Sequence, residues 1–398
     1  MAATDAAALN IALLLLTFSV KNSDQKCFVA KNQHKNYCDS LDDLYNNNDL
    51  LKDVTITERD NTPNLEEFKA VPLEVAQNIE RLQLRSVINK VNEDAFVNFT
   101  SIQFLTLFKN KLDEIPVGIF RNLNVRILDF YQNGIGRLSP GAFVNLTKME
   151  EIRFPFNNLT KITFNIFNNL TTKGLVLSNN QISKIEKFSF GNMPNLKKLF
   201  LDNNLLTEFI AQENLHHPEV LEKLWLHSNR LTEVTVYMLE GLTNLKVLNL
   251  GFNSISSIEP KAFAETPKLQ ILVLTHNSLK VISGNILPTT GLDELQILYL
   301  DHNRLTYLSS NFFFRLNALR LASIGGNPWQ CPCLDLVLRW LYDNGVKLNC
   351  DKAYLNGERP VCVVPDVNNV CVYSYDENHY QRFQSQISLY PPPPWCIL

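Results

Sequence analysis

A chain of 398 residues usually forms two or three domains, unless an internal repeat extends one core along a single axis. Its hydrophobic fraction of 45% is enough for a large core, and its net charge of −3 gives no bulk attraction to polyanions. Nucleic acid and anionic lipid are therefore disfavoured as main partners.

Residues 1–23 are predicted to be a secretory signal peptide. An apolar run from Ile11 to Phe18 is followed by small and polar residues, and the run is too short to span a bilayer comfortably. No Lys or Arg precedes the run and Asp5 stands where a positive charge is expected, so a buried helix is the alternative. No later run approaches the ~18 residues of a membrane helix. We expect a secreted, extracellular protein without a transmembrane span.

Residues 24–78 are predicted to form an N-terminal cap. They show no clear repeat and hold two cysteines, Cys27 and Cys38, in the stretch CFVAKNQHKNYC. A disulfide between these two would close a small local loop. Because thiols oxidise outside the cell, we predict this disulfide.

From Ile79 the sequence cycles through one pattern, L-x-x-L-x-L-x-x-N-x-L, which is best seen in LQILVLTHNSLKVI and LQILYLDHNRLTYL. The pattern predicts about eleven repeats over residues 79–327, the first of which has Val87 at the asparagine position. The pattern-closing asparagines are Asn110, Asn133, Asn157, Asn180, Asn204, Asn229, Asn253, Asn277, Asn303 and Asn327.

The spacing of the leucines predicts a stack of strands. The two leucines of L-x-L point to one side of a short strand, and the residue between them points to the other side. Each repeat can bury its leucines only against its neighbours, so we expect one parallel sheet in which asparagine amides bond backbone groups of adjacent turns. A second buried column behind the sheet would make the stack curve, with the sheet on the concave face. Its predicted members are Phe96, Phe120, Phe143, Phe167, Phe190, Leu239, Phe263, Leu287 and Phe313.

These repeats resemble the leucine-rich repeats of extracellular proteins, in the class of roughly 24 residues found in Toll-like receptor ectodomains, Slit-type proteins and insect leucine-rich immune proteins. The resemblance covers about Ile79 to Cys362. It implies an α/β solenoid, namely a leucine-rich-repeat horseshoe with a parallel sheet on the concave face, about eleven repeats and disulfide caps. The motif is specific for the fold and says little about the ligand.

Residues 328–362 are predicted to be a C-terminal cysteine-rich cap. The stretch GGNPWQCPCLDLVLRWL contains Cys331 and Cys333, and Cys350 and Cys362 follow. This spacing would suggest zinc in a cytosolic chain, whereas the predicted signal peptide favours disulfides. The segment is similar to the C-terminal cap of extracellular leucine-rich repeats, and that resemblance implies pairing of Cys331 with Cys350 and of Cys333 with Cys362. Such a cap covers the exposed edge of the last repeat.

Residues 363–398 form a tail with two further cysteines, Cys371 and Cys396. Two outcomes are open. The two cysteines pair with each other, or one of them forms a disulfide with another chain, as the resemblance to insect leucine-rich immune proteins suggests.

Four acceptor motifs predict N-glycosylation at Asn98, Asn145, Asn158 and Asn169. Sugars at these sites would crowd the N-terminal repeats and leave the repeats from Phe190 onward bare. The alternative is that some of these motifs stay unmodified.

The solvent-facing residue inside L-x-L is large and apolar in several repeats. Such side chains are unexpected on an exposed sheet unless they contact a partner, and aromatic residues dominate binding energy at interfaces. We therefore predict a protein-binding patch flanked by histidines; the alternative is that strands favour aromatic residues, which pack on each other. The predicted patch comprises Phe200, Trp225, His227, Asn249, Val273, His276, Tyr299, Asp301 and His302.

The histidines of this patch also raise the question of a metal site or of pH-dependent binding. His227 and His276 belong to repeats two apart, which places them ~10 Å from each other, beyond the reach of one ion. The sequence therefore predicts solvated histidines, no metal site and no cofactor.

No nucleophile elbow, phosphate-binding glycine loop or H-E-x-x-H motif occurs, so we do not expect an enzyme. The expected function is that of a secreted leucine-rich-repeat protein that binds another extracellular protein through its concave face, in extracellular or innate-immune recognition. The immune role rests on the resemblance alone. Two alternatives are a secreted inhibitor of an extracellular enzyme and an adhesion or matrix protein.

Overall fold

The computed structural model describes residues 27–29, 35–46, 50–57, 65–167, 169–349, 362–363 and 370–387. The predicted signal peptide lies outside the described residues. The chain divides into two compact units, residues 1–158 and 159–398, and each is described by itself.

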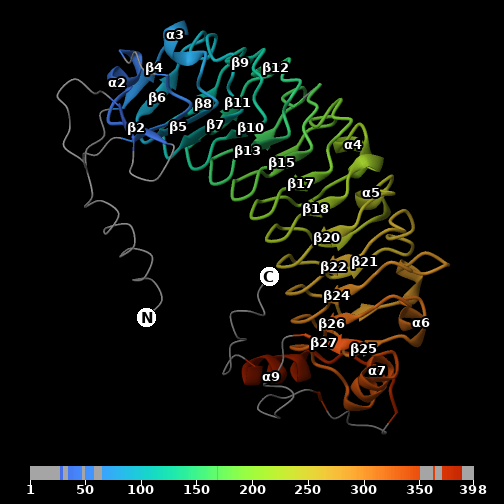
Figure 1. The fold of residues 1–398 in the computed structure, drawn as a ribbon. Helices are drawn as coiled ribbons and strands as arrows, with labels where there is room; N and C mark the ends of the chain where they lie inside the picture. The colour runs from blue at the N-terminus through green and yellow to red at the C-terminus, as the bar shows by residue number, and fades with distance from the viewer. Residues whose placement is uncertain are drawn as a thin grey trace. The chain divides into compact units, whose positions relative to one another are not determined.

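Unit 1 is a stack of short strands, drawn in blue and teal in Figure 1. Its sheet strands are β1 (Cys27–Val29), β2 (Asn36–Cys38), β3 (Asp53–Thr57), β5 (Arg81–Arg85), β7 (Phe104–Phe108), β10 (Ile127–Asp129) and β13 (Glu151–Arg153). The first two strands are antiparallel, and all later neighbours are parallel and in chain order. Since β3 pairs with β5, parallel pairing extends into the segment predicted as the N-terminal cap.

The remaining elements of unit 1 are two-residue to four-residue strands on the return loops and two short helices. They are α2 (Leu41–Tyr45), β4 (Glu66–Phe68), α3 (Leu73–Ala76), β6 (Ile88–Val91), β8 (Glu114–Ile115), β9 (Phe120–Arg121), β11 (Arg137–Leu138) and β12 (Phe143–Val144).

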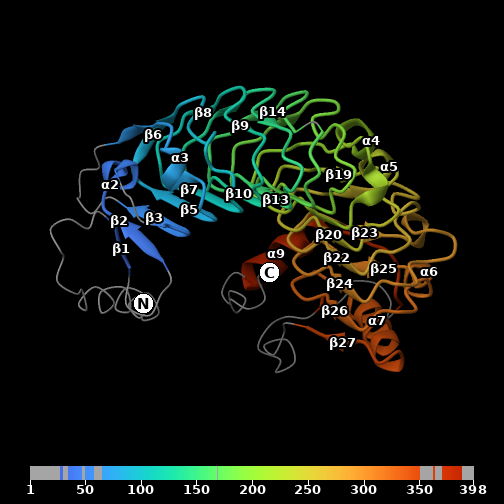
Figure 2. The same cartoon turned by 45° about the horizontal axis from the view of Figure 1, so that its top comes forward.

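Unit 2 continues the same pattern, and Figure 2 shows β20, β22, β24 and β26 side by side. Its sheet strands are β15 (Gly174–Val176), β17 (Lys198–Phe200), β18 (Lys223–Trp225), β20 (Val247–Asn249), β22 (Ile271–Val273), β24 (Ile297–Tyr299), β26 (Leu321–Ser323) and β27 (Lys347–Leu348). All neighbours are parallel, and the buried leucines pair without a shift in register.

The other side of unit 2 carries short helices and return strands, which Figure 1 shows away from the sheet. They are β14 (Lys161–Ile162), β16 (Lys184–Ile185), α4 (Ala211–Asn214), η1 (Pro218–Val220), β19 (Glu233–Val234), α5 (Val236–Leu239), β21 (Ser257–Ile258), β23 (Val281–Ile282), η2 (Gly284–Ile286), β25 (Tyr307–Leu308) and α6 (Ser310–Phe313). The C-terminal helices are α7 (Cys331–Asp343) and α9 (Glu377–Ile387).

The predicted repeats are confirmed. Among the described residues, four strands of unit 1 (β5, β7, β10, β13) and seven of unit 2 (β15 to β26) carry the pattern, which gives eleven repeats. Their L-x-L leucines are buried, for example Leu199 and Leu224 with no exposed surface. The molecule is therefore an α/β solenoid within each unit.

The predicted structural role of the pattern-closing asparagines, which we call the asparagine ladder, is confirmed. In unit 2 the side-chain oxygen of Asn327 accepts hydrogen bonds from the backbone N–H groups of Asn303 and Leu305, and its nitrogen donates to Leu300 O at 2.9 Å. In unit 1, Asn133 bonds its neighbours in the same way, with Nδ2 donating to Leu107 O at 2.7 Å. Each asparagine satisfies backbone groups that would otherwise be buried without partners.

The second buried column is also present. All nine predicted members are buried, with exposed fractions between 0% and 7%. In unit 1 the rings of Phe120 and Phe143 stack with centroids 5.8 Å apart, and in unit 2 those of Phe167 and Phe190 lie 6.2 Å apart. This column fills the space between the sheet and the return loops.

Three disulfides join described cysteines. Cys27 pairs with Cys38, as predicted, on the neighbouring strands β1 and β2. The predicted partners of the other two cysteines are wrong: Cys331 pairs with Cys362, and Cys333 pairs with Cys371. Cys350, the predicted partner of Cys331, lies outside the described residues.

Backbone hydrogen bonds explain the corrected pairing. Val363 accepts a hydrogen bond from Cys331 N and donates one to Trp329 O, so its neighbour Cys362 is held with its Cα 4.9 Å from that of Cys331. The other disulfide reaches into the segment predicted as the tail. Since Cys371 is bonded to Cys333, its predicted pairing with Cys396 or with another chain is wrong as well. Cys396 lies outside the described residues.

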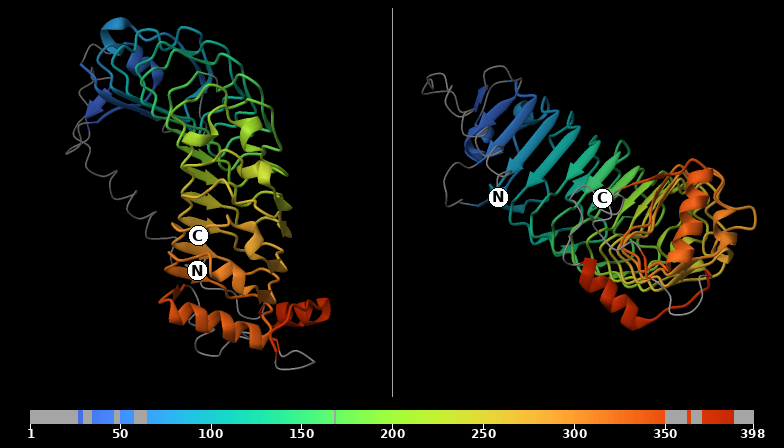
Figure 3. Two further views of the ribbon diagram at one scale, coloured as in Figure 1. Left: turned by 90° about the vertical axis from the view of Figure 1, so that its right-hand side faces the viewer. Right: turned by 90° about the horizontal axis from the view of Figure 1, so that it is seen from below.

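The C-terminal cap covers the last repeat of unit 2, as Figure 3 shows for α7. Leu334, Val337 and Leu341 form the buried side of α7, and the Trp340 ring lies 4.8 Å from that of Phe313. Trp329 is 1% exposed and donates from its indole nitrogen to Ile324 O. The cap therefore buries apolar surface that the end of the stack would leave bare.

The segment after Cys371 returns to the side of the preceding repeats. The ammonium of Lys280 lies 4.2 Å from the centre of the Tyr375 ring, and the guanidinium of Arg304 lies 4.6 Å from that of Tyr380 on α9. Arg304 also faces Glu377 at 3.9 Å. Cation–π contacts thus hold α9 and the segment before it against the preceding repeats of unit 2.

Candidate functional site

The candidate site lies on the side of the unit 2 sheet that faces away from the buried leucines, which we call the open face. Strand residues alternate between the two sides, so the residue between the two leucines of each repeat belongs to the open face. Two groups of side chains occupy it.

The first group, the aromatic cluster, consists of Phe200, Trp225 and His227. Phe200 and Trp225 are directly paired in register on β17 and β18, and both are half-buried. Their ring centroids lie 5.2 Å apart, and the Trp225 ring lies 5.7 Å from that of His227. An aromatic surface of this kind is suited to burial against a partner.

Two polar atoms of the aromatic cluster have no hydrogen-bond partner among the described residues. They are Nε1 of Trp225 and Nδ1 of His227, and both are buried. Burial lowers the pKa of His227, although Asp202, whose Oδ2 lies 3.8 Å from His227 Nε2, opposes that shift. The cluster is therefore neutral near pH 7 and carries unused hydrogen-bonding capacity.

The second group, the histidine column, consists of Phe252, His276 and His302. Each precedes a ladder asparagine and has a positive φ, between 52° and 53°. The His276 ring stacks between Phe252 and His302, with centroids 4.2 Å from each. The column ends at Gly326, where a Cβ atom would lie 2.8 Å from Cδ2 of His302. Glycine is required there because the His302 ring lies against its backbone.

Asp301 joins the two histidines through hydrogen bonds. Its Oδ2 lies 3.2 Å from Nδ1 of His302 and accepts a hydrogen bond of 2.5 Å from the hydroxyl of Thr275. That hydroxyl also lies 3.0 Å from Nδ1 of His276. Burial opposes ionisation of Asp301, but hydrogen bonds from His302, Thr275 and Ser323 outweigh burial, so its pKa is below the usual value. Burial, followed by the neighbouring His302, lowers the pKa of His276 to about 4.

Other residues of the predicted patch are buried rather than displayed. Asn249 and Val273 are 7% and 3% exposed, and the Asn249 side chain accepts a hydrogen bond from Gly251 N. Tyr299 is 8% exposed, and its hydroxyl accepts a hydrogen bond of 3.1 Å from Nδ2 of Asn349, near the cap. The structure therefore divides the predicted patch into the aromatic cluster and the histidine column, separated by packed positions.

Unit 1 carries a ring ladder that lies outside the predicted patch. Phe108, Tyr131 and Phe156 follow each other with centroid distances of 5.1 Å and 5.1 Å. Arg85 and Lys109 lie 4.8 Å and 5.4 Å from the centre of the Phe108 ring. In the sequence these aromatic residues recur one or two positions before the closing asparagine of three consecutive repeats, namely Asn110, Asn133 and Asn157.

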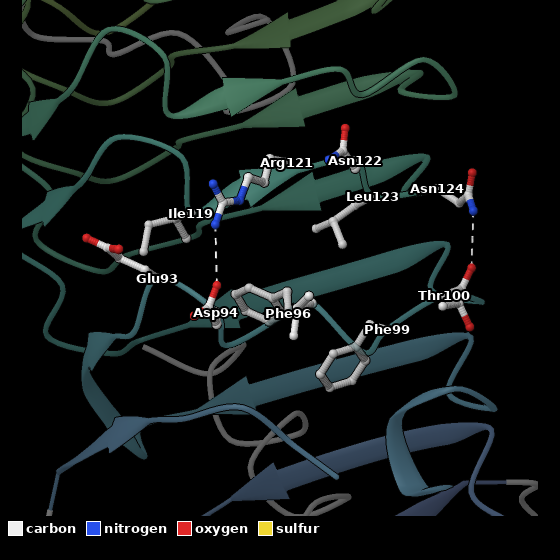
Figure 4. A pocket seen from close by; sticks show the side chains of 11 residues that line it. Glu93, Asp94, Phe96, Phe99, Thr100, Ile119, Arg121, Asn122, Leu123 and Asn124 are labelled. Atoms are coloured by element: carbon white, nitrogen blue, oxygen red, sulfur yellow. Dashed lines mark hydrogen bonds and ion pairs between the residues drawn. The ribbon is translucent and has the colours of Figure 1, made fainter. Parts of the chain in front are cut away.

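The return loops of unit 1 enclose a small pocket of about 160 Å³. Figure 4 shows Arg121 and Asp94 facing each other across it, 3.3 Å apart, with Phe96 and Phe99 at its base. Small-molecule sites usually enclose ~300 Å³ or more, so this space is a gap between repeats.

Family models match most of the repeat region. The model described as "Leucine rich repeat" matches residues 219–279 and 267–328, and the model described as "BspA type Leucine rich repeat region (6 copies)" matches residues 42–137, 73–197 and 129–227. The matches begin within the segment where parallel pairing also begins, around β3.

Two curated relatives share parts of the chain. Opticin of Bos taurus is 37% identical over 73 residues, which is 18% of this chain and 22% of opticin. Toll-like receptor 5 of Homo sapiens is 30% identical over 152 residues, which is 37% of this chain and 16% of the receptor. The chain thus matches less than a quarter of the length of either relative.

Solved structures share the fold. A chain of the Toll–Spatzle complex, described as a hub in Drosophila development and innate immunity, has a TM-score of 0.57 at 24% identity over 73% of this chain and 41% of that chain. A chain of the octameric complex of Latrophilin 3, Unc5D and FLRT2 (LRR) has a TM-score of 0.52 at 22% identity over 78% of this chain and 93% of that chain. With the repeat pattern, the asparagine ladder and the two family models, which together span residues 42–328, the chain belongs to the leucine-rich-repeat proteins.

Proposed function

We propose that the chain is a secreted, non-enzymatic protein that binds another extracellular protein through the open face of unit 2, in extracellular or innate-immune recognition. The observation that carries the proposal is the aromatic cluster. Phe200 and Trp225 form a half-buried pair on the neighbouring strands β17 and β18, and the buried indole N–H of Trp225 has no hydrogen-bond partner among the described residues. Aromatic side chains of this kind provide most of the binding energy at many interfaces.

The solved relatives support a role in protein binding. The matched chains come from assemblies with other proteins, including the Toll–Spatzle complex and the complex of FLRT2 (LRR) with Latrophilin 3 and Unc5D. Because those matches are less than 25% identical in sequence, they support a role in protein binding only through the shared fold.

Extracellular location is supported by the cysteine chemistry. Six described cysteines form three disulfides, and such bonds persist mainly in oxidising compartments. Three predicted glycosylation sites, Asn145, Asn158 and Asn169, are exposed, whereas Asn98 is half-buried and its Nδ2 donates to Val71 O at 2.7 Å. No helix within the described ranges has the length and apolar character needed to cross a membrane.

The proposal is tested by capture from the source's own extracellular fluid. The bait is the disulfide-intact chain, compared with a Phe200→Ala/Trp225→Ala variant. The matched control is Tyr237→Ala/Phe314→Ala, which removes two exposed aromatic rings from the side opposite the sheet, 61% and 68% exposed. We expect one partner to bind the native chain and the control, and to bind the cluster variant at least about 30-fold more weakly.

Equal capture by the cluster variant and the native chain would refute the role of the open face. The identity and effect of the partner then separate the alternatives. A secreted inhibitor binds an enzyme and lowers its rate, whereas an adhesion or matrix protein binds cell surfaces or itself. A partner that is seen only on non-reducing gels is linked by a disulfide, and binding would then depend on a cysteine of this chain.

A further inference from the structure

The polar groups around Asp301 converge on one point of the open face. One donor atom each from His276, Asp301 and His302 lies within 4.8 Å of the other two. Zinc binds imidazole nitrogen and carboxylate oxygen at ~2.0–2.2 Å, so two ligands of a tetrahedral ion lie ~3.3–3.5 Å apart. The 3.2 Å between Asp301 Oδ2 and His302 Nδ1 is close to this spacing.

The hydrogen bonds identify which ring nitrogens face that point. The Asp301 carboxylate only accepts, so the Thr275 hydroxyl must donate to it, and the hydroxyl oxygen then accepts from Nδ1 of His276. His302 Nδ1 likewise donates to Asp301. His302 Nε2 is buried and has no partner among the described residues. The hydrogen bonds that the described residues make with the two rings are therefore on the Nδ1 side, next to the carboxylate.

We propose that His276, Asp301 and His302 bind a divalent transition-metal ion of the zinc class through the two Nδ1 atoms and Oδ2 of Asp301. Two imidazoles and one carboxylate favour zinc, copper or nickel over magnesium and calcium, which prefer oxygen ligands alone. On binding, the ion replaces the two Nδ1 protons, which move to Nε2 within each neutral ring or exchange through solvent. The Thr275 hydroxyl stays adjacent and water or a partner's side chain completes the coordination.

The packing of the column both restrains and permits this site. The two rings are nearly parallel, at 10°, so their in-plane lone pairs do not yet converge. The His276 ring must tilt so that its Nδ1 approaches by about 1 Å. His276 and His302 keep part of their surface exposed, which leaves a route for an ion. The distance argument against a metal applied to His227 and His276, not to this pair from consecutive repeats.

The test is zinc binding to the full, untagged chain after treatment with a chelator. Titration calorimetry with Zn²⁺ is expected to give one saturable site that excess Mg²⁺ or Ca²⁺ does not block. His276→Gln and His302→Gln should each weaken binding at least about tenfold. Co²⁺ should give the visible absorption of a tetrahedral site in the native chain and not in these variants.

The matched control is His216→Gln/His217→Gln, which removes an adjacent histidine pair with rings 4.8 Å apart elsewhere on unit 2. Retained binding in this control supports the proposed site, and loss of binding there assigns the ion to that pair and overturns the proposal. Absence of saturable binding also overturns it. Melting curves recorded with chelator present show whether each variant folds. If a histidine variant does not fold, Asp301→Asn takes its place in the binding measurement.

This site is independent of the proposed function because the metal alone is the probe. If zinc does not bind, the proposed recognition of a protein by the aromatic cluster is not affected. Failure of partner capture likewise leaves the metal site standing.

Discussion

The side-chain oxygen of Asn204 accepts a hydrogen bond of 2.9 Å from the backbone N–H of Ile182, which lies one repeat earlier. Its amide nitrogen donates to Leu177 O and Leu201 O, both at 3.0 Å. A single buried side chain therefore satisfies three backbone groups from two repeats.

Replacing this side chain should destabilise unit 2. Asn204→Ala leaves buried backbone groups unpaired, and each such group costs about 1–3 kcal/mol, so the free energy of unfolding should fall by about 2–4 kcal/mol. Urea unfolding monitored by circular dichroism measures the change. The control is Asn317→Ala, an exposed asparagine with one long hydrogen bond of 3.4 Å, which should change stability by less than about 0.5 kcal/mol. Equal losses in both variants would contradict the ladder's role.

His227 should make the stability of the chain depend on pH. Burial lowers its pKa in the folded state below the ordinary histidine value of about 6.5, so the unfolded chain binds this proton more readily. The contribution is complete above pH 6.5 and is lost as the pH falls toward the folded-state pKa. Unfolding in urea at pH 7.5 and at lower pH, with chelator present, should show this loss in the native chain.

The variant His227→Phe keeps a ring beside Trp225 but cannot bind a proton. It should lose less stability than the native chain between the same two pH values. His379→Phe, on α9 outside the repeats, is the control and should behave like the native chain. An identical pH dependence in His227→Phe and the native chain would rule out the proposed contribution.

The disulfide pairing can be read directly from peptides. Digestion without reduction, followed by mass spectrometry, should give linked peptides that contain Cys331 with Cys362 and Cys333 with Cys371. Because Cys331 and Cys333 are separated by one residue, cleavage conditions or fragmentation must distinguish the two bonds. A linked peptide that joins Cys331 to Cys350 would support the pairing implied by the resemblance and contradict the structure.

Much of the fold follows from the sequence because the repeat fixes both direction and register. The buried leucines, the asparagines and the second column recur at constant spacing, and each contact they make is with the same position of an adjacent repeat. Cys331 shows where this reasoning fails. Cysteine spacing allows several pairings, and the choice depends on hydrogen bonds between Val363 and the segment that contains Trp329.

The candidate site was only partly predictable for a similar reason. Alternation along the strand identifies Phe200 and Trp225 as open-face residues, but it does not show that Tyr299 is covered near the cap through Asn349. The stacking of His276 on His302 depends on the positive φ that both residues adopt before the ladder asparagine. Strand alternation contains no information about that conformation.

The bond between Cys333 and Cys371 determines how mechanical load would enter the molecule. A pulling force on α9 is transmitted through this covalent link to the first turn of α7, which is packed on the last repeat. The Arg304–Tyr380 contact is a second, weaker attachment of α9 to the repeats. Tension would therefore be shared by the cap before it reached the sheet.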